Sequence, residues 1–274
     1  MSPSSPKPLL YLLFALLTLP LLRALAAPPP LTFHASRFTT TLLLYDAASG
    51  SIPAAPLMNF ADFPPGAATP FFESGATVLD TTVQGSGTYA GWVSEGTITP
   101  GFPILDRGNG FQVNFTVQVE NEIHGNNNRA GFSMIFLSND KKGVELAFWE
   151  DEIWVQNDSS TGGLFTHGEG AAFDTTASLT DYQVMIVGDT YTVTAGTNVI
   201  LTGAVRDYTD FAGTIDPYET PNFLFFGDDT TSAQARIHLS YVSVTPVFSD
   251  FIYLPVVIAE TAGAGQAENS GNRR

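Results

Sequence analysis

The stretch Phe111–Glu120, FQVNFTVQVE, decides the fold class of this chain. Its odd-numbered positions are Phe or Val, and its even-numbered positions are Gln, Asn, Thr or Glu. An alternation with a period of two places all the apolar side chains on one face of a β-strand, whereas a helix would distribute them around its surface. The pattern therefore predicts a strand that is buried on one face.

Similar segments lie on both sides of this stretch and are separated by turn-forming clusters such as Gly125-Asn126-Asn127-Asn128 and Gly188-Asp189. No segment after Ala27 has a sustained helical period. Closely spaced strands without intervening helices favour two packed antiparallel sheets, so we predict an all-β, two-sheet antiparallel jelly-roll sandwich. The further strands predicted are Phe38–Tyr45, Gly75–Val83, Gly131–Ser138, Gly143–Trp149, Glu152–Gln156, Tyr182–Val187, Thr190–Ala195, Asn198–Thr202, Asn222–Phe226 and Ala233–Val244.

Residues 1–26 have the features of a secretory signal peptide. Lys7 stands in a short basic start, an apolar run extends from Leu9 to Leu22, and Ala24-Leu25-Ala26 precedes the expected cleavage site. The run is interrupted by Pro20 and is shorter than the ~20 residues that span a bilayer. We therefore expect a secreted or cell-surface protein whose mature chain, from Ala27 on, has no transmembrane span.

The mature chain is long enough for one large β domain, which we place over residues 27–247. Residues 248–274 form a separate C-terminal segment. Its apolar motif, Phe251–Ile258, is too short to cross a membrane and predicts an edge strand or docking element, with a sorting signal as the alternative. Glu260–Arg274 is rich in small and polar residues and is predicted to be disordered.

The charge of the chain excludes one class of partner. Without Lys7 and Arg23, the 11 basic residues fall to 9 against 27 acidic ones, which gives a net charge of −18. Such a surface repels nucleic acid. The acidic residues are interpreted as a solvated surface, with a calcium site on Asp228 and Asp229 as the sharper alternative. The absence of cysteine excludes disulfides and thiolate chemistry, and no other cofactor is predicted.

Five phrases occur in a fixed order along the chain, namely NRAGFS (Asn128–Ser133), VELAFWEDEIWVQ (Val144–Gln156), LFTHGEG (Leu164–Gly170), LTGAVRDY (Leu201–Tyr208) and PNFLFFGDDTTSA (Pro221–Ala233). Together they resemble the choice-of-anchor Y family of bacterial secreted proteins. The resemblance covers residues 36–244 and implies a concanavalin A-like or laminin-G-like sandwich at the cell surface, without an established activity. The chain departs from the family's frequent sorting tails, because it has no final basic cluster beyond Arg273-Arg274.

The strand that includes Glu145 carries the candidate ligand surface. Alternation places Glu145, Ala147 and Trp149 on one face, so that a carboxylate and an indole project together. Sugars offer apolar C–H faces to aromatic rings and hydroxyl groups to polar side chains. The alternative is that the two tryptophans fill a core and that Glu145 pairs with Arg129. The candidate ligand-binding residues are Arg129, Glu145, Trp149, Trp154 and Gln156, with His167 and Glu169 in a following loop.

An enzyme would need a second feature, namely paired carboxyl groups about 5–10 Å apart. The laminarinase-type pattern Glu-x-Asp-x-x-Glu is broken here, because Ala147 stands in the place of the central Asp and because Glu145 and Glu150 face opposite sides of an unbulged strand. A pair of Glu145 with Glu169 is the remaining candidate, and no catalytic residue is assigned. We therefore expect a non-enzymatic protein that binds an extracellular glycan or cell-surface component, with a purely structural domain or a glycan hydrolase or lyase as alternatives.

Overall fold

The computed structural model describes residues 40–83, 85–94 and 96–247. These residues belong to one unit of the chain, Ser36–Arg274. The predicted signal peptide and the segment 248–274, with its motif Phe251–Ile258, lie outside the described residues, so both remain predictions.

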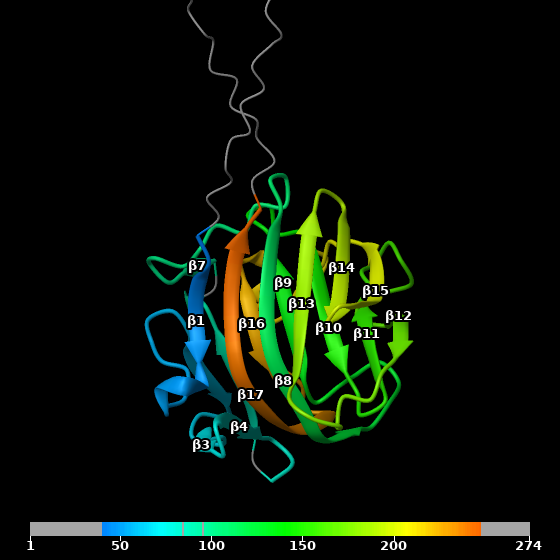
Figure 1. The fold of residues 1–274 in the computed structure, drawn as a ribbon. Coiled ribbons are helices and arrows are strands. Elements are labelled where there is room, and N and C mark those ends of the chain that lie inside the picture. The colour runs from blue at the N-terminus through cyan, green and yellow to red at the C-terminus, as the bar shows by residue number, and fades with distance from the viewer. Residues whose placement is uncertain (1–39, 84, 95, 248–274) are drawn as a thin grey trace, which may run out of the picture. The chain divides into compact units, whose positions relative to one another are not determined.

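The strands form two main antiparallel sheets, which lie as layers one behind the other (Figure 1). Sheet A has the order β15 (Asn198–Ala204), β14 (Thr190–Ala195), β13 (Thr180–Val187), β8 (Phe111–His124), β17 (Ala233–Pro246), β4 (Ala76–Asp80) and β3 (Phe71–Glu73), and β1 (Leu42–Asp46) also pairs with β17. Sheet B has the order β12 (His167–Ala172), β11 (Glu152–Gln156), β10 (Gly143–Phe148), β9 (Ser133–Leu137), β16 (Leu224–Gly227), β5 (Ser86–Ala90) and β2 (Asn59–Phe63).

Few other elements occur in the described part of the chain. A small hairpin joins β6 (Trp92–Ser94) to β7 (Thr97–Ile98), and two short 3-10 turns, η1 (Ala47–Ser49) and η2 (Pro217–Glu219), complete the order. Within the described ranges, no helix has the length and apolar character needed to cross a membrane. The predicted all-β, two-sheet antiparallel jelly-roll sandwich is confirmed.

The core lies between the two sheets and follows the period-two pattern. The five apolar residues of FQVNFTVQV on β8 are each at most 1% exposed. The Phe115 ring stacks on Tyr182 with their centroids 5.3 Å apart, and it meets Phe148 from sheet B edge-on at 6.2 Å. Burying side chains of this size from both sheets provides the main stabilisation of the sandwich.

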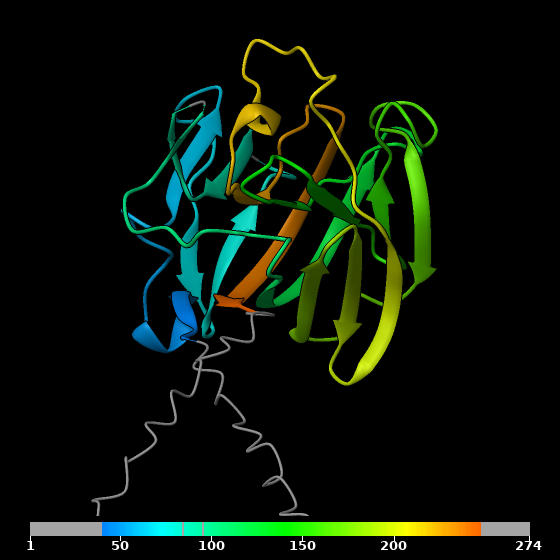
Figure 2. The same cartoon turned by 90° about the horizontal axis from the view of Figure 1, so that it is seen from above.

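The outer face of sheet B is only partly exposed. Val144, Leu146 and Phe148 of β10 point into the core, so the alternating residues Glu145 and Ala147 point outward. The segment 205–222, which carries η2, packs Tyr208 and Tyr218 against the outward side chains of this sheet, and its yellow trace can be followed in Figure 2. This segment forms one wall of a cleft that is described below.

Two parts of sheet B differ from the prediction. The strands β2 and β5 were not predicted, and His167 and Glu169 lie in strand β12 instead of a loop. The sequence of β12, HGEGAA, has a low β propensity. Close packing requires Gly168, because a Cβ there would lie 2.6 Å from the Val155 carbonyl oxygen, whereas a Cβ on Gly170 would displace the flexible Glu152 carboxylate, 2.0 Å away.

The first and last described strands lie side by side in sheet A. Leu42 of β1 pairs with Val244 of β17. The Thr41 and Thr245 hydroxyl groups are hydrogen-bonded at 2.9 Å. The chain therefore enters and leaves this domain at neighbouring positions of the sheet that does not carry the cleft.

Candidate functional site

A cleft of about 860 Å³ lies on the outer face of sheet B. Its floor contains small side chains, Ala130, Ser133 and Ala147, which leave space above the strands. Aromatic and aliphatic side chains line it as well, and two of them, Phe63 and Ile215, are 62% and 60% exposed. The cleft thus combines this apolar surface with polar side chains, among them Glu145, Gln156 and Arg129.

Glu145 and Gln156 are neighbours in the floor of this cleft. The register of β10 with β11 pairs Leu146 with Val155, which places Glu145 across from Gln156 on the outward face. Tyr208 links the two backbones, because its hydroxyl donates to the Gln156 carbonyl at 2.8 Å and accepts from the Glu145 N–H at 3.1 Å. Tyr208 itself is fully buried and cannot reach a ligand.

Glu145 is 3% exposed, and the Tyr218 hydroxyl donates to its carboxyl Oε2 at 2.5 Å. Burial, followed by the nearby charge of Asp229, raises the pKa of Glu145 to about 8, although the Tyr218 hydrogen bond and the Arg129 charge oppose the change. The neutral form therefore dominates at pH 7. A neutral carboxyl group can donate a hydrogen bond as well as accept one.

Asp228 and Asp229 also line the cleft. Asp228 is 2% exposed and accepts a hydrogen bond from the Thr230 N–H at 3.0 Å; burial raises its pKa to about 7. Asp229 faces the open cleft, and the protein around it raises the pKa of its carboxyl group by desolvation. Among the described residues, no three His, Cys, Asp or Glu side chains gather as a metal-binding group. Calcium on Asp228 and Asp229 stays a prediction.

Arg129 lines the cleft beside these carboxyl groups. Its Nη1 donates to the carbonyl oxygens of Asn128 at 2.6 Å and Phe165 at 2.9 Å, and its guanidinium carbon lies 5.9 Å from the centre of the Phe165 ring. Within the described ranges, no carboxylate lies within 4.0 Å of this guanidinium. The alternative prediction of an Arg129–Glu145 ion pair is therefore wrong, although Arg129 is near enough to lower the pKa of Glu145.

The predicted aromatic residues lie beside the cleft and support its floor. Trp154 is fully buried and stacks on His167 with centroids 4.3 Å apart, so the prediction that Trp154 contacts a ligand is wrong in this conformation. Trp149 is half-buried, and His124 covers one of its faces at 4.3 Å. The Trp149 indole donates to the Arg129 carbonyl oxygen at 2.8 Å and thereby helps to position the Arg129 loop.

Glu169 does not belong to this surface. Alternation along β12 turns it toward sheet A, where its carboxylate accepts hydrogen bonds from the Tyr191 hydroxyl at 2.7 Å and from Arg206 at 2.5 Å. The predicted surface therefore contains Arg129, Glu145 and Gln156 but not Glu169. The candidate catalytic pair of Glu145 and Glu169 is not formed, because the two carboxyl groups lie on opposite faces of sheet B.

Several residues of the cleft were missed by the sequence analysis. Phe63, Trp92 and Tyr218 reach it from the edge strand β2, the hairpin β6–β7 and the turn η2. Only Tyr218 had a local signal: Asp216-Pro217 begins a helical turn, and the Asp216 carboxylate accepts from the Tyr218 N–H at 3.0 Å. Tertiary packing alone brings these three side chains to the cleft.

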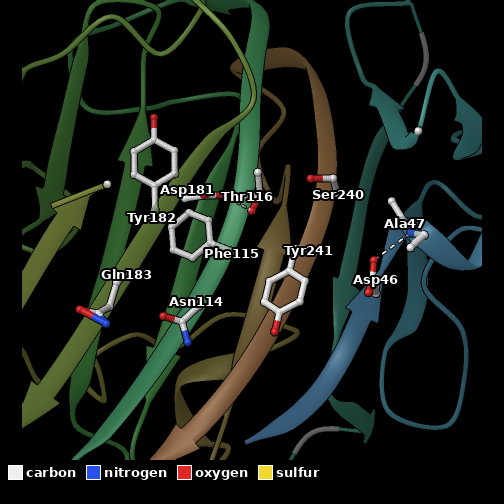
Figure 3. A pocket seen from close by; sticks show the side chains of 13 residues that line it. Asp46, Ala47, Asn114, Phe115, Thr116, Asp181, Tyr182, Gln183, Ser240 and Tyr241 are labelled. Carbon is white, nitrogen blue, oxygen red and sulfur yellow. Dashed lines mark hydrogen bonds between the residues drawn. The ribbon is translucent and has the colours of Figure 1, made fainter.

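A second hollow, of about 610 Å³, lies on sheet A and contains none of the predicted site residues (Figure 3). Both of its carboxylates already have hydrogen-bond partners. The Asp181 carboxylate accepts from the Thr116 hydroxyl at 2.6 Å, and Asp46 accepts from the Ala48 N–H at 2.8 Å. The cleft on sheet B is therefore the better candidate site.

No protein-family model and no curated protein matches the chain. The resemblance to the choice-of-anchor Y family thus stays a prediction.

Solved structures of similar fold include three carbohydrate-active proteins. A carbohydrate esterase from the Shiga toxin-encoding bacteriophage phi24B is 13% identical and covers 76% of this chain and 99% of its own, with a TM-score of 0.47. The endo-β-1,3-glucanase of Pyrococcus furiosus is 12% identical and covers 75% and 94%, also with a TM-score of 0.47. The endo-1,3-β-glucanase of Streptomyces sioyaensis is 13% identical and covers 81% and 100%, with a TM-score of 0.44. At these identities the likeness concerns the fold and says nothing of a ligand.

Proposed function

We propose that this chain is a secreted or cell-surface protein of the choice-of-anchor type that binds a glycan, without cleaving it, in the cleft of sheet B. The observation that carries the proposal is the composition of the cleft. Exposed apolar side chains, with Phe63 foremost, stand beside buried hydrogen-bonding groups on Glu145 and Gln156. A sugar ring presents the same two kinds of surface, C–H faces and hydroxyl groups.

Glu145 and Asp229 favour a second candidate, a glycan hydrolase or lyase, because a carboxyl group with a pKa of about 8 beside another carboxyl group is typical of a general acid. The geometry favours binding instead. Glu145 is 3% exposed, and its Oε2 accepts from Tyr218. Cleavage also needs a second carboxyl group across the scissile bond, and the predicted partner, Glu169, lies on the opposite face of sheet B, where Tyr191 and Arg206 hold it.

The test is a glycan-array screen of the chain from Ala27 on, with and without calcium. The informative variant is Phe63→Ala, because this side chain is 62% exposed on the edge strand β2 and contributes little to the core. The matched control is Val199→Ala, which is 63% exposed on the edge strand β15 of sheet A.

We expect Phe63→Ala to weaken glycan binding about fivefold or more, which corresponds to about 1 kcal/mol for one lost stacking contact. The Val199→Ala variant is expected to bind like the parent protein. Absence of binding to every glycan in both calcium conditions would refute the proposal and favour a purely structural domain. Release of new reducing ends from a bound glycan would favour the enzyme.

A further inference from the structure

A row of small residues forms a hollow in the floor of the cleft. Ser133 on β9 pairs with Ala147 on β10 and, on its other side, with Gly227 on β16. These three outward positions lie side by side across the middle of sheet B. Only glycine fits at position 227, because its φ is +143° and because a Cβ there would lie 2.5 Å from the Gly87 carbonyl oxygen. The hollow is thus a fixed feature of the fold.

The groups around this hollow are predominantly acidic. Asp62, Glu145, Asp228 and Asp229 line the cleft, whereas Arg129 is the only cationic residue that lines it in the described part of the chain. Two backbone carbonyl oxygens already occupy Nη1 of Arg129. The whole chain carries a net charge of −16. This net charge repels an anionic ligand and attracts a cationic one, whereas the cleft carboxyl groups with raised pKa values act mainly as hydrogen-bonding groups until they ionise.

Two buried polar atoms at the floor lack partners among the described residues. They are Oγ of Ser133 and Oε1 of Gln156, whose residues are 3% and 4% exposed. The Gln156 amide nitrogen donates to the Asn128 carbonyl oxygen at 3.4 Å, which leaves Oε1 as an acceptor. Buried polar groups without partners are rare in folded proteins, and at a binding site they mark positions that a ligand satisfies.

Together these observations specify the ligand more closely than the proposed function, on which this inference rests. We propose that the cleft selects a glycan with a free amino group, and that its ammonium occupies the hollow between Glu145, Gln156 and Asp229. An ammonium group brings three N–H donors, a positive charge and no acceptor. The surroundings offer carboxyl groups and unpaired acceptors, so the two are complementary. An N-acetylated sugar lacks the charge and adds a methyl group and a carbonyl oxygen.

The same assignment predicts that binding releases a proton. The titratable and charged groups that face Glu145 are Tyr208, Tyr218, Asp229 and Arg129. The free carboxyl group is neutral at mildly acidic pH, because its pKa is raised to about 8. A cation bound beside it lowers the pKa of this carboxyl group, so binding releases a proton to the extent that the pKa falls to the working pH.

The experiment is calorimetry at about pH 5.5 with the tetrasaccharides of glucosamine and of N-acetylglucosamine, together with tri-lysine as a charge-only probe. We expect the glucosamine form to bind at least tenfold more tightly than either of the others. Repeating the titration in buffers of different ionisation enthalpy is expected to show proton release. Equal or tighter binding of the N-acetylated form would overturn the inference. Equal binding of tri-lysine would also overturn it, because the cleft would then recognise the positive charge and not the sugar.

Variants separate a specific site from attraction by the total charge. Asp229→Asn is expected to reduce the preference for glucosamine about tenfold. Asp151→Asn removes the same charge from the exposed turn between β10 and β11 and is expected to leave the preference unchanged. Equal losses in both variants would overturn the inference. If the array shows glycan binding but the glucosamine form does not bind, this inference fails alone; if no glycan binds, the proposed function fails with it.

Discussion

The neutral carboxyl group of Glu145 is expected to make the stability of the fold depend on pH. Its pKa is about 8 in the folded protein against an ordinary 4.5, because burial disfavours the charged form. The folded state therefore binds this proton more tightly than the unfolded state. The stabilising contribution is complete below about pH 4.5, decreases as the pH rises and is lost once the pH has passed through about 8.

The magnitude follows from the two pKa values. One pKa unit corresponds to about 1.4 kcal/mol, so the protein is expected to lose about 4 kcal/mol of stability through Glu145 between pH 5 and pH 9. Glu145→Gln keeps the shape and the acceptor for Tyr218 but cannot ionise. It should therefore lack this part of the loss, although Asp228, with a pKa of about 7, continues to contribute.

The assay is urea denaturation at pH 5, 7 and 9, followed by tryptophan fluorescence, for the parent protein and the Glu145→Gln variant. Asp151→Asn is the control, since Asp151 is exposed in the turn that follows β10. The free energy of unfolding of Glu145→Gln is expected to exceed that of the parent at pH 9 and to approach it at pH 5. Parallel losses of stability in the two proteins would refute the reasoning.

Three other substitutions test individual contacts by thermal and chemical denaturation. Gly143→Ala should cost about 3 kcal/mol or more, because its Cβ would lie 1.7 Å from the Phe136 carbonyl oxygen; a mild effect would contradict the tight β9–β10 packing. Glu169→Gln leaves the Arg206 side chain, 5% exposed, without its anionic partner and is expected to cost about 2 kcal/mol; no loss would show that the pair is not needed. Tyr208→Phe removes the link between the Glu145 N–H and the Gln156 carbonyl oxygen and is expected to cost about 1–3 kcal/mol, and a variant as stable as the parent would mean that these groups find other partners.

Local alternation explains why part of the fold and of the site could be predicted. On β8 and β10 the two faces meet different environments, so the pattern of apolar residues defines both the strand and the direction of each side chain. Glu145 was therefore placed correctly on the outward face. Arg129 and Gln156, which were predicted to share a surface with Glu145, also line the cleft.

The errors occur where tertiary contacts override local pattern. β12 contains two glycines, one of which an adjacent backbone atom requires, so its sequence resembles a loop; Glu169 was therefore expected in a loop at the candidate surface, whereas the strand turns it to the other face. A register shift between Trp154 and Gln156, where β11 meets β12, is also invisible in the sequence. Phe63 and Tyr218 come from segments without periodicity, and only the packing of those segments against sheet B brings them to the cleft.

The pairing of β1 with β17 also determines how the domain can be presented. The Thr41–Thr245 hydrogen bond holds the two chain ends of the domain together on sheet A. Domains with adjacent ends can be inserted into a longer chain without distortion. A tether at either end, or at both, would therefore be attached through sheet A, which leaves the opening of the cleft on the opposite layer of the sandwich.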